Sequence, residues 1–161
     1  TAFEKRVKPP KKPLEARMLN WEQVRTMRCA GLSFGAHTMT HPAVSRLEPQ
    51  ALREELLESK QLLEAGLDCP VEDFAYPFGK PEDASCVAED FLRNCGYRSA
   101  VATTYGFNTA ITNRFRLNRL PVGETWSAID LAFNISCLFF QGRAETSEQV
   151  FDVGRHRLEG I

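Results

Sequence analysis

Long hydrophobic runs, an excess of charge of one sign and closely paired cysteines are all missing from this sequence of 161 residues. The most apolar stretch, residues 131–140, is interrupted by Asn134 and Ser136 and is shorter than the roughly 20 apolar residues that span a bilayer. The 20 basic and 21 acidic residues leave a net charge of -1, which provides no basic field for nucleic acid. We therefore expect no membrane span and no nucleic-acid partner.

The cysteines are five in number, an odd count, and none of them forms a CxxC motif. Neither a disulfide framework nor a cysteine-based zinc site is indicated by this spacing. We interpret the thiols as small buried apolar groups, which is compatible with a reducing compartment. The five residues are Cys29, Cys69, Cys86, Cys95 and Cys137.

Histidine is also scarce, and two of the three histidines lie four positions apart at His37 and His41, directly before Pro42. A short apolar segment, residues 32–36, precedes them and is typical of a buried strand. Pro42 disfavours a helical conformation at His41, so we place the pair on a turn that follows a strand. Two imidazoles in such a turn are a candidate half of a metal site, although histidine pairs at this spacing also occur for structural reasons.

Helical and extended patterns alternate along the chain. We expect helices over about 21–30, from Pro49 to Gly66, from a cap at Asp83 or Ser85 to Gly96, and after a cap at Thr125. Extended segments are expected over 32–36, 74–76, 99–103 and 115–122. The third helix should bury Val87, Phe91 and Leu92. In the last helix, one face should carry Trp126, Ile129, Phe133 and Cys137. This alternation predicts an α/β fold of parallel βα units.

Residues 35–42 resemble the histidine motif of the polysaccharide deacetylases, carbohydrate esterase family four, whose pattern is His-(Ser/Thr)-x-x-His-Pro. Segments 74–79, 96–101 and 116–120 continue the resemblance in the order of the family, so that it covers about residues 19–140. The resemblance implies a distorted (β/α) barrel. On this basis we divide the chain into a basic, proline-rich linker (1–18), the C-terminal part of the barrel (19–140) and a polar tail (141–161).

The family's roles can be carried to matching positions. His37 and His41 would be metal ligands, with zinc as the expected divalent metal, and the Thr38 hydroxyl would fix the loop of the motif. Phe78 could alternatively belong to the core, and Arg119 could alternatively be an ion-pair partner on the surface. The residues implied to contact a sugar are Tyr76, Pro77, Phe78, Gly79 and Arg119.

Three departures from the family pattern stand out. The family's aspartate pair, which supplies the general base and a third metal ligand, is missing, because no aspartate precedes His37. Ala75 occupies the place of an arginine, as in a subfamily that reads Phe-Ala-Tyr-Pro-Phe-Gly, and Arg119 is a candidate replacement for that cation. The family's late Leu-x-His motif is not recognisable, and His156 has a polar, tail-like setting.

We therefore expect the C-terminal part of a longer enzyme, with the catalytic aspartate upstream of Thr1 and the first strand or strands supplied upstream or by another chain. The expected activity is metal-dependent removal of N-acetyl groups from a polysaccharide or oligosaccharide. The isolated 161 residues should bind metal weakly and lack activity. Two alternatives stay open, namely a non-catalytic or carbohydrate-binding domain without the aspartate pair, and an esterase or amidase for a small acetylated substrate. The resemblance implies a cell-envelope or extracytoplasmic location. The cysteines, in contrast, are compatible with a reducing compartment such as the cytoplasm.

Overall fold

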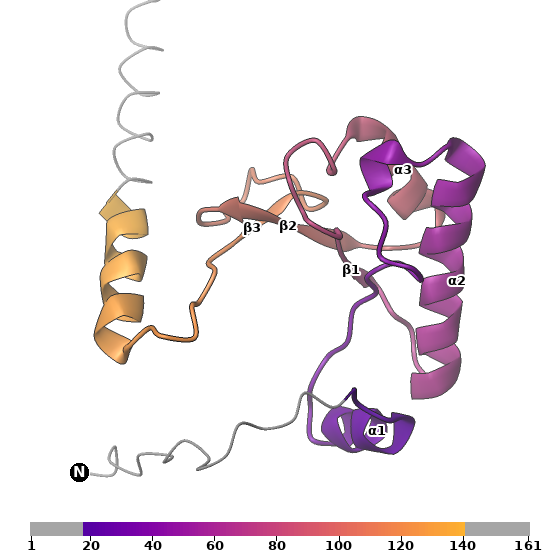
Figure 1. Cartoon of the computed structure of the whole chain (residues 1–161), viewed down its shortest axis with the longest axis horizontal. Helices are drawn as coiled ribbons and strands as arrows, with labels where there is room; N and C mark the ends of the chain where they lie inside the picture. The colour runs from indigo at the N-terminus through magenta and orange to yellow at the C-terminus, as the bar shows by residue number, and fades with distance from the viewer. Residues whose placement is uncertain (1–17, 141–161) are drawn as a thin grey trace, which may run out of the picture. The chain divides into compact units, whose positions relative to one another are not determined.

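The computed structural model describes residues 18–140 (Figure 1). Residues 1–17 of the predicted linker (1–18) lie outside the described residues, as does the predicted tail over 141–161, which includes His156. Helix α1 belongs to one unit of the chain, which ends at Ser33, and all other elements belong to a second unit that begins at Phe34. The elements are α1 (Trp21–Cys29), η1 (Val44–Arg46), α2 (Pro49–Leu67), β1 (Asp73–Ala75), α3 (Cys86–Asn94), β2 (Ser99–Tyr105) and β3 (Leu117–Arg119), followed by a helix over residues 128–140.

Helix α1 has the boundaries that its capping residues predict. Asn20 accepts a hydrogen bond from the backbone of Gln23, and Gln23 accepts one in return from the backbone of Asn20. This reciprocal pair satisfies two amide groups that have no partner inside the helix. Gly31, with a φ of 94°, follows the end of the helix.

The three strands form a parallel sheet in the order β1-β2-β3. The strand expected over residues 32–36 is reduced to one bridge, in which Ala36 pairs with Phe74 in parallel. Its two hydrogen bonds run from Ala36 N to Asp73 O and from Ala75 N to Ala36 O, each 2.9 Å long. The predicted α/β class with parallel strands is confirmed. A barrel is not formed within residues 18–140, since one bridge and three strands are too few to close a sheet.

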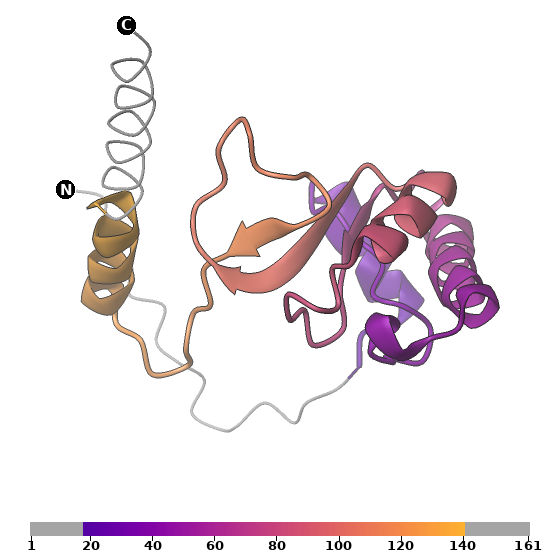
Figure 2. The same cartoon turned by 90° about the horizontal axis from the view of Figure 1, so that it is seen from above.

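Helices α2 and α3 pack beside each other on one side of the sheet (Figures 1 and 2). Helix α2 starts at Pro49 as predicted and buries Leu52 and Leu56. It continues beyond Gly66 to Leu67, and its C-cap is Asp68, whose φ of 52° is left-handed. The prediction that Gly66 ends this helix is therefore wrong, because an aspartate here adopts the conformation that usually favours glycine.

Helix α3 is capped by Ser85, one of the two predicted candidates, which accepts a hydrogen bond from Ala88 N. Its buried residues are Ala88, Glu89 and Leu92, whereas Val87 is 58% exposed. The predicted burial of Val87 is wrong because the helix turns the Ala88 and Leu92 side toward the core. Glu89 is tolerated on that side because it accepts hydrogen bonds from Asn113 and Arg116.

The last helix differs most from its prediction. Ser127 caps it in place of Thr125 and exchanges hydrogen bonds with Asp130. Ile129 and Phe133, expected on a buried face, are 80% and 67% exposed, and Leu138 is the buried residue. The expected burial of the cysteines is wrong, since Cys29 and Cys86 are exposed and the other three thiol residues are half-buried. Within residues 18–140, no helix has both the length and the apolar character needed to cross a bilayer.

Tyr97 ties the core to helix α2. Its ring is 3% exposed, it stacks edge-on against Phe74 with 5.4 Å between ring centroids, and its hydroxyl donates a hydrogen bond of 2.8 Å to Leu56 O. Burial raises the pKa of the Tyr97 phenol to about 12 from an ordinary value of 10.0. The folded state therefore disfavours ionisation of this phenol.

We predict that Tyr97 accounts for a fall of about 2 kcal/mol in the free energy of unfolding between pH 10 and 12. Below pH 10 both states keep the Tyr97 proton and stability is complete, whereas above it only the unfolded state loses the proton. Urea unfolding at several pH values measures this loss. Tyr97→Phe should reduce it, although buried Tyr76, whose pKa is also raised, contributes in the same direction. Exposed Tyr105→Phe serves as the control, and an unchanged loss in Tyr97→Phe would contradict the assignment.

Candidate metal centre and the pocket beside it

The two histidines lie on a turn that follows Ala36 at the carboxyl end of its bridge to β1. Thr38 and His41 both have left-handed backbones, with φ values of 64° and 61°. The Thr38 hydroxyl donates to His37 O at 2.5 Å and accepts from His41 N at 3.1 Å. This threonine therefore joins the backbone of the first histidine to that of the second, a geometry compatible with the loop-fixing role expected for it.

His37 and His41 point their rings close to each other. The ring centroids are 4.8 Å apart, the planes are inclined by 73°, and both side chains are exposed. His37 Nδ1 lies 2.7 Å from Ala75 O. Since a carbonyl oxygen can only accept, Nδ1 carries the proton and donates it there, which leaves the Nε2 lone pair of His37 open for a cation. The pair therefore suits metal binding.

Two imidazoles do not complete a zinc site, which uses three or four protein ligands. Within residues 18–140, no cluster of three or more His, Cys, Asp or Glu side chains could hold a metal ion. The described residues thus fit a divalent cation only in part. The missing ligands agree with the absence of an aspartate before His37 in the sequence.

Glu55, on helix α2, anchors the middle of the histidine turn. Its Oε2 accepts from Met39 N at 2.7 Å and from Thr40 N at 3.0 Å, and its Oε1 accepts from the Thr40 hydroxyl at 2.5 Å. Burial raises the pKa of the Glu55 carboxyl, but the hydrogen bonds from Thr40 and Met39 outweigh it, so that the pKa is lowered. The amphipathic pattern of α2 places Glu55 on its solvent face, so sequence reasoning missed these contacts.

The segment over residues 76–79 divides into buried and exposed parts. Tyr76 is 1% exposed, and its hydroxyl donates to Phe115 O at 3.0 Å. Burial, with a smaller contribution from the charge of Glu89, raises the pKa of the Tyr76 phenol. Pro77 is also buried, so neither ring presents a face to solvent. A sugar-facing wall built from Tyr76 and Pro77 is not formed in this structure, because both side chains fill the core.

Phe78 is the member of this segment that faces outward. Its side chain is 56% exposed, which contradicts the alternative of a core residue, and its ring centroid lies 5.0 Å from that of His41. Its φ of 60° is left-handed. Within residues 18–140, the backbone N–H of Phe78 has no hydrogen-bond partner, whereas Gly79 N donates to Pro77 O at 2.6 Å. Phe78 therefore offers an exposed ring face beside His41 and a backbone donor that is unpaired within the described residues.

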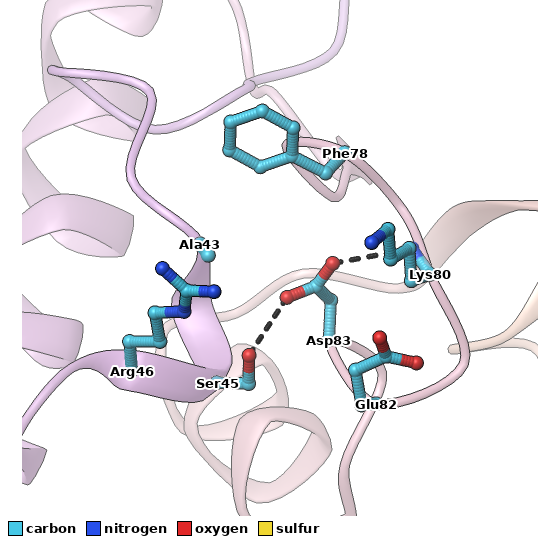
Figure 3. Close-up of a pocket in the computed structure, with 7 residues that line it drawn as sticks. All are labelled: Ala43, Ser45, Arg46, Phe78, Lys80, Glu82 and Asp83. Atoms are coloured by element: carbon cyan, nitrogen blue, oxygen red, sulfur yellow. Dashed lines mark hydrogen bonds between the residues drawn. The ribbon is translucent and has the colours of Figure 1, made fainter.

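A pocket of about 270 Å³ opens next to the Phe78 ring (Figure 3). Asp83 forms its floor, is 2% exposed, and accepts from the Ser45 hydroxyl at 2.8 Å and from Lys80 N at 3.1 Å. The bond from Ser45 joins η1 to the loop before α3 across the pocket. Its lining residues are Ala43, Ser45, Arg46, Phe78, Lys80, Glu82 and Asp83.

Arg119 lies on β3, and β2 separates that strand from β1. Its Nε donates a hydrogen bond of 2.7 Å to Ala102 O, so one donor of the guanidinium is bonded to the backbone of β2. The structure does not bring Arg119 together with the two histidines.

Comparisons with known proteins agree with this arrangement. The family model for polysaccharide deacetylase matches residues 7–100. The protein YxkH of Bacillus subtilis (strain 168) is 27% identical over 109 residues, which cover 68% of this chain and 38% of that protein.

Two solved structures are similar in fold and in sequence. The Streptococcus pyogenes deacetylase PplD in complex with acetate has a TM-score of 0.67 and 26% identity, over 74% of this chain and 52% of that one. BC0361, a polysaccharide deacetylase from Bacillus cereus, has a TM-score of 0.66 and 25% identity, over 75% of this chain and 38% of that one. The chain thus spans between 38% and 52% of the length of these three relatives. With more than half of its residues matched by the family model, the chain belongs to the polysaccharide deacetylase family.

Proposed function

We propose that this chain is part of a metal-dependent hydrolase that removes N-acetyl groups from the amino-sugar units of a polysaccharide. The observation that carries the proposal is the pair of neighbouring imidazoles, one of which has its tautomer fixed by Ala75 O. Family membership supports a hydrolase that acts on acetylated sugar. We take zinc as the metal, because its borderline softness suits imidazole nitrogen.

When bound, such a metal lowers the pKa of a water ligand toward ~7 and polarises an acyl oxygen. His37 would hold it through Nε2, which its Nδ1 hydrogen bond leaves open, and His41 would hold it through a ring nitrogen. Thr38 would keep the main chains of the two histidines joined. The N–H of Phe78 is our candidate donor to the oxyanion, since it has no partner in the described part of the chain and belongs to the residue whose ring contacts His41. No side chain in residues 18–140 is proposed as the general base.

We further propose that the pocket beside Phe78 receives a sugar ring. An exposed aromatic face suits the apolar side of a pyranose, and open charged groups suit its hydroxyls. Arg46 and Lys80 supply donors, and Glu82 supplies an acceptor, around the floor that Asp83 forms. Gly79 allows the backbone turn after Phe78, while Tyr76 and Pro77 support the segment from beneath.

The general base, the remaining metal ligand and the strands that close a barrel would come from residues outside this chain segment. Ala36 pairs with β1, and within residues 18–140 no strand pairs with the other side of Ala36, so a further parallel strand can add there. The matched region covers 52% and 38% of the two solved relatives, so the rest of each relative leaves room for such strands.

Acetate release from N-acetylglucosamine oligomers by the full-length protein tests the proposal. We expect release that stops on treatment with a metal chelator and returns with Zn²⁺, and no release from the 161 residues alone. Release that continues unchanged in chelator would contradict a metal mechanism. Release from aryl acetates without any from the oligomers would favour an esterase for small substrates.

A non-catalytic, carbohydrate-binding function is the second candidate. It is favoured by the lack of a third metal ligand among residues 18–140. The upstream sequence distinguishes the two candidates, because an Asp-Asp pair after an apolar strand supports the enzyme, and its absence supports the binding domain.

Phe78→Ala is predicted to raise the KM for an N-acetylglucosamine oligomer about tenfold, because the exposed ring loses its contact with the sugar, a cost of about 1.4 kcal/mol. Steady-state kinetics of the full-length protein measure the change. Phe133→Ala, which removes another exposed ring, on the last helix, should leave KM unchanged. Equal effects of both substitutions would refute a sugar contact at Phe78.

A further inference from the structure

The histidine turn has a conformation that its own sequence does not favour. Thr38 and His41 are left-handed although neither is glycine, and Thr38 is β-branched. Backbone of this kind persists only where surrounding contacts hold it in place. Within residues 18–140, the hydrogen bonds that tie the turn to other elements are the one from His37 to Ala75 O and the three to Glu55.

Glu55 is well placed to act as a rigid support. It lies in helix α2 between Leu52 and Leu56, which are 3% and 1% exposed and fix this part of the helix against the core. Its carboxylate reaches across 15 residues of sequence to Thr40, the residue directly before His41. Both oxygens are used, so that the two backbone amides and the hydroxyl face a single acceptor group.

We propose that Glu55 is a positioning residue, which holds the middle of the turn so that His37 and His41 stay close enough to bind one cation. This inference rests on the proposed function, because it concerns the same pair of ligands. Glu55 itself touches neither imidazole in the hydrogen bonds of the structure, and acts through Met39 and Thr40. Hydrogen-bonding groups that orient metal ligands in this way typically change metal affinity 10–100-fold when they are removed.

Metal affinity distinguishes this role from a general contribution to stability. Zn²⁺ binding to the full-length protein, stripped of metal, is measured by competition with a chromophoric chelator. Glu55→Ala should weaken Zn²⁺ binding about tenfold or more. Glu55→Gln, which keeps the size of the side chain but provides one acceptor oxygen in place of two, should lie between Glu55→Ala and the wild type. Glu58→Ala, an exposed acid one turn further along the same helix, is the matched control and should bind as the wild type does.

Thermal unfolding of each variant without metal shows whether it is folded. If Glu55→Ala does not fold, Glu55→Gln decides, since weaker Zn²⁺ binding in the folded variant supports the proposal and wild-type affinity overturns it. A second readout is the imidazole NMR spectrum, in which the His37 and His41 signals should broaden or double in the Glu55 variants. Sharp, unshifted signals together with wild-type affinity would end the proposal.

The His37→Ala, His41→Ala double variant separates this inference from the proposed function. If the double variant binds Zn²⁺ as tightly as the wild type, the two histidines are not the metal site, and both ideas fail. If it loses Zn²⁺ while the Glu55 variants keep it, the metal site stands and the positioning role of Glu55 is excluded.

Discussion

Alanine at both His37 and His41 is expected to lower acetate release by the full-length protein about a thousandfold or more. A bound metal contributes several kcal/mol to stabilising the transition state, and a thousandfold corresponds to about 4 kcal/mol. The rings lie side by side and exposed, so their removal leaves no packed cavity. The change is measured as kcat/KM on an N-acetylglucosamine oligomer, with metal content determined on the same samples.

His156→Ala is the control, because it removes the third histidine of the sequence, which carries no role in the proposal. We expect it to keep full activity and metal content. Substantial activity in the double variant, or an equal loss in His156→Ala, would show that the catalytic metal is bound elsewhere. Unfolding temperatures near the wild-type value in both variants would confirm that the comparison concerns the site.

Gly79→Ala is expected to destabilise the fold by about 3 kcal/mol or more. Gly79 has a φ of 64°, and a Cβ there would lie 2.8 Å from both the backbone nitrogen and Cγ2 of Thr103. The conformation is strained for alanine, and the clash falls on a backbone atom of β2 that cannot turn away. The same substitution would disturb the hydrogen bond from Thr103 N to Gly79 O, which is 2.8 Å long. Urea unfolding of the 161-residue chain measures the loss.

Gly96→Ala separates the conformational cost from the clash. Gly96 is also left-handed, with a φ of 80°, but the nearest atom to its added Cβ is Lys60 Cε at 3.8 Å. It should therefore cost only about 1 kcal/mol. Equal losses for the two variants would show that the approach of Thr103 to Gly79 contributes nothing to stability.

The positions of the main elements were predictable because their signals are local. Asn20, Pro49 and Ser85 mark helix starts through capping or a missing amide, and all three start helices in the structure. The turn at the histidines was also predictable, because Pro42 excludes a helix at His41 by sterics alone.

Features that depend on distant partners were not predictable. The segment over residues 32–36 has the composition of a strand but keeps only the bridge at Ala36, because pairing requires a neighbour that composition does not reveal. Glu55 has the position of a solvated acid on α2, and only the fold brings Met39 and Thr40 to it. Burial of Tyr76 was missed for a similar reason, since its hydroxyl partner is the carbonyl of Phe115, 39 residues away.

His37 Nδ1 is bonded to the main-chain oxygen of Ala75, and this determines which substitutions of Ala75 would affect the histidine. No change of side chain at position 75 can delete that oxygen, so the imidazole keeps its orientation whether alanine or a larger residue stands there. Proline is the exception, because Ala75 N donates to Ala36 O and proline has no amide hydrogen to give. The contribution of position 75 to the histidine thus comes from its peptide group and not from its side chain.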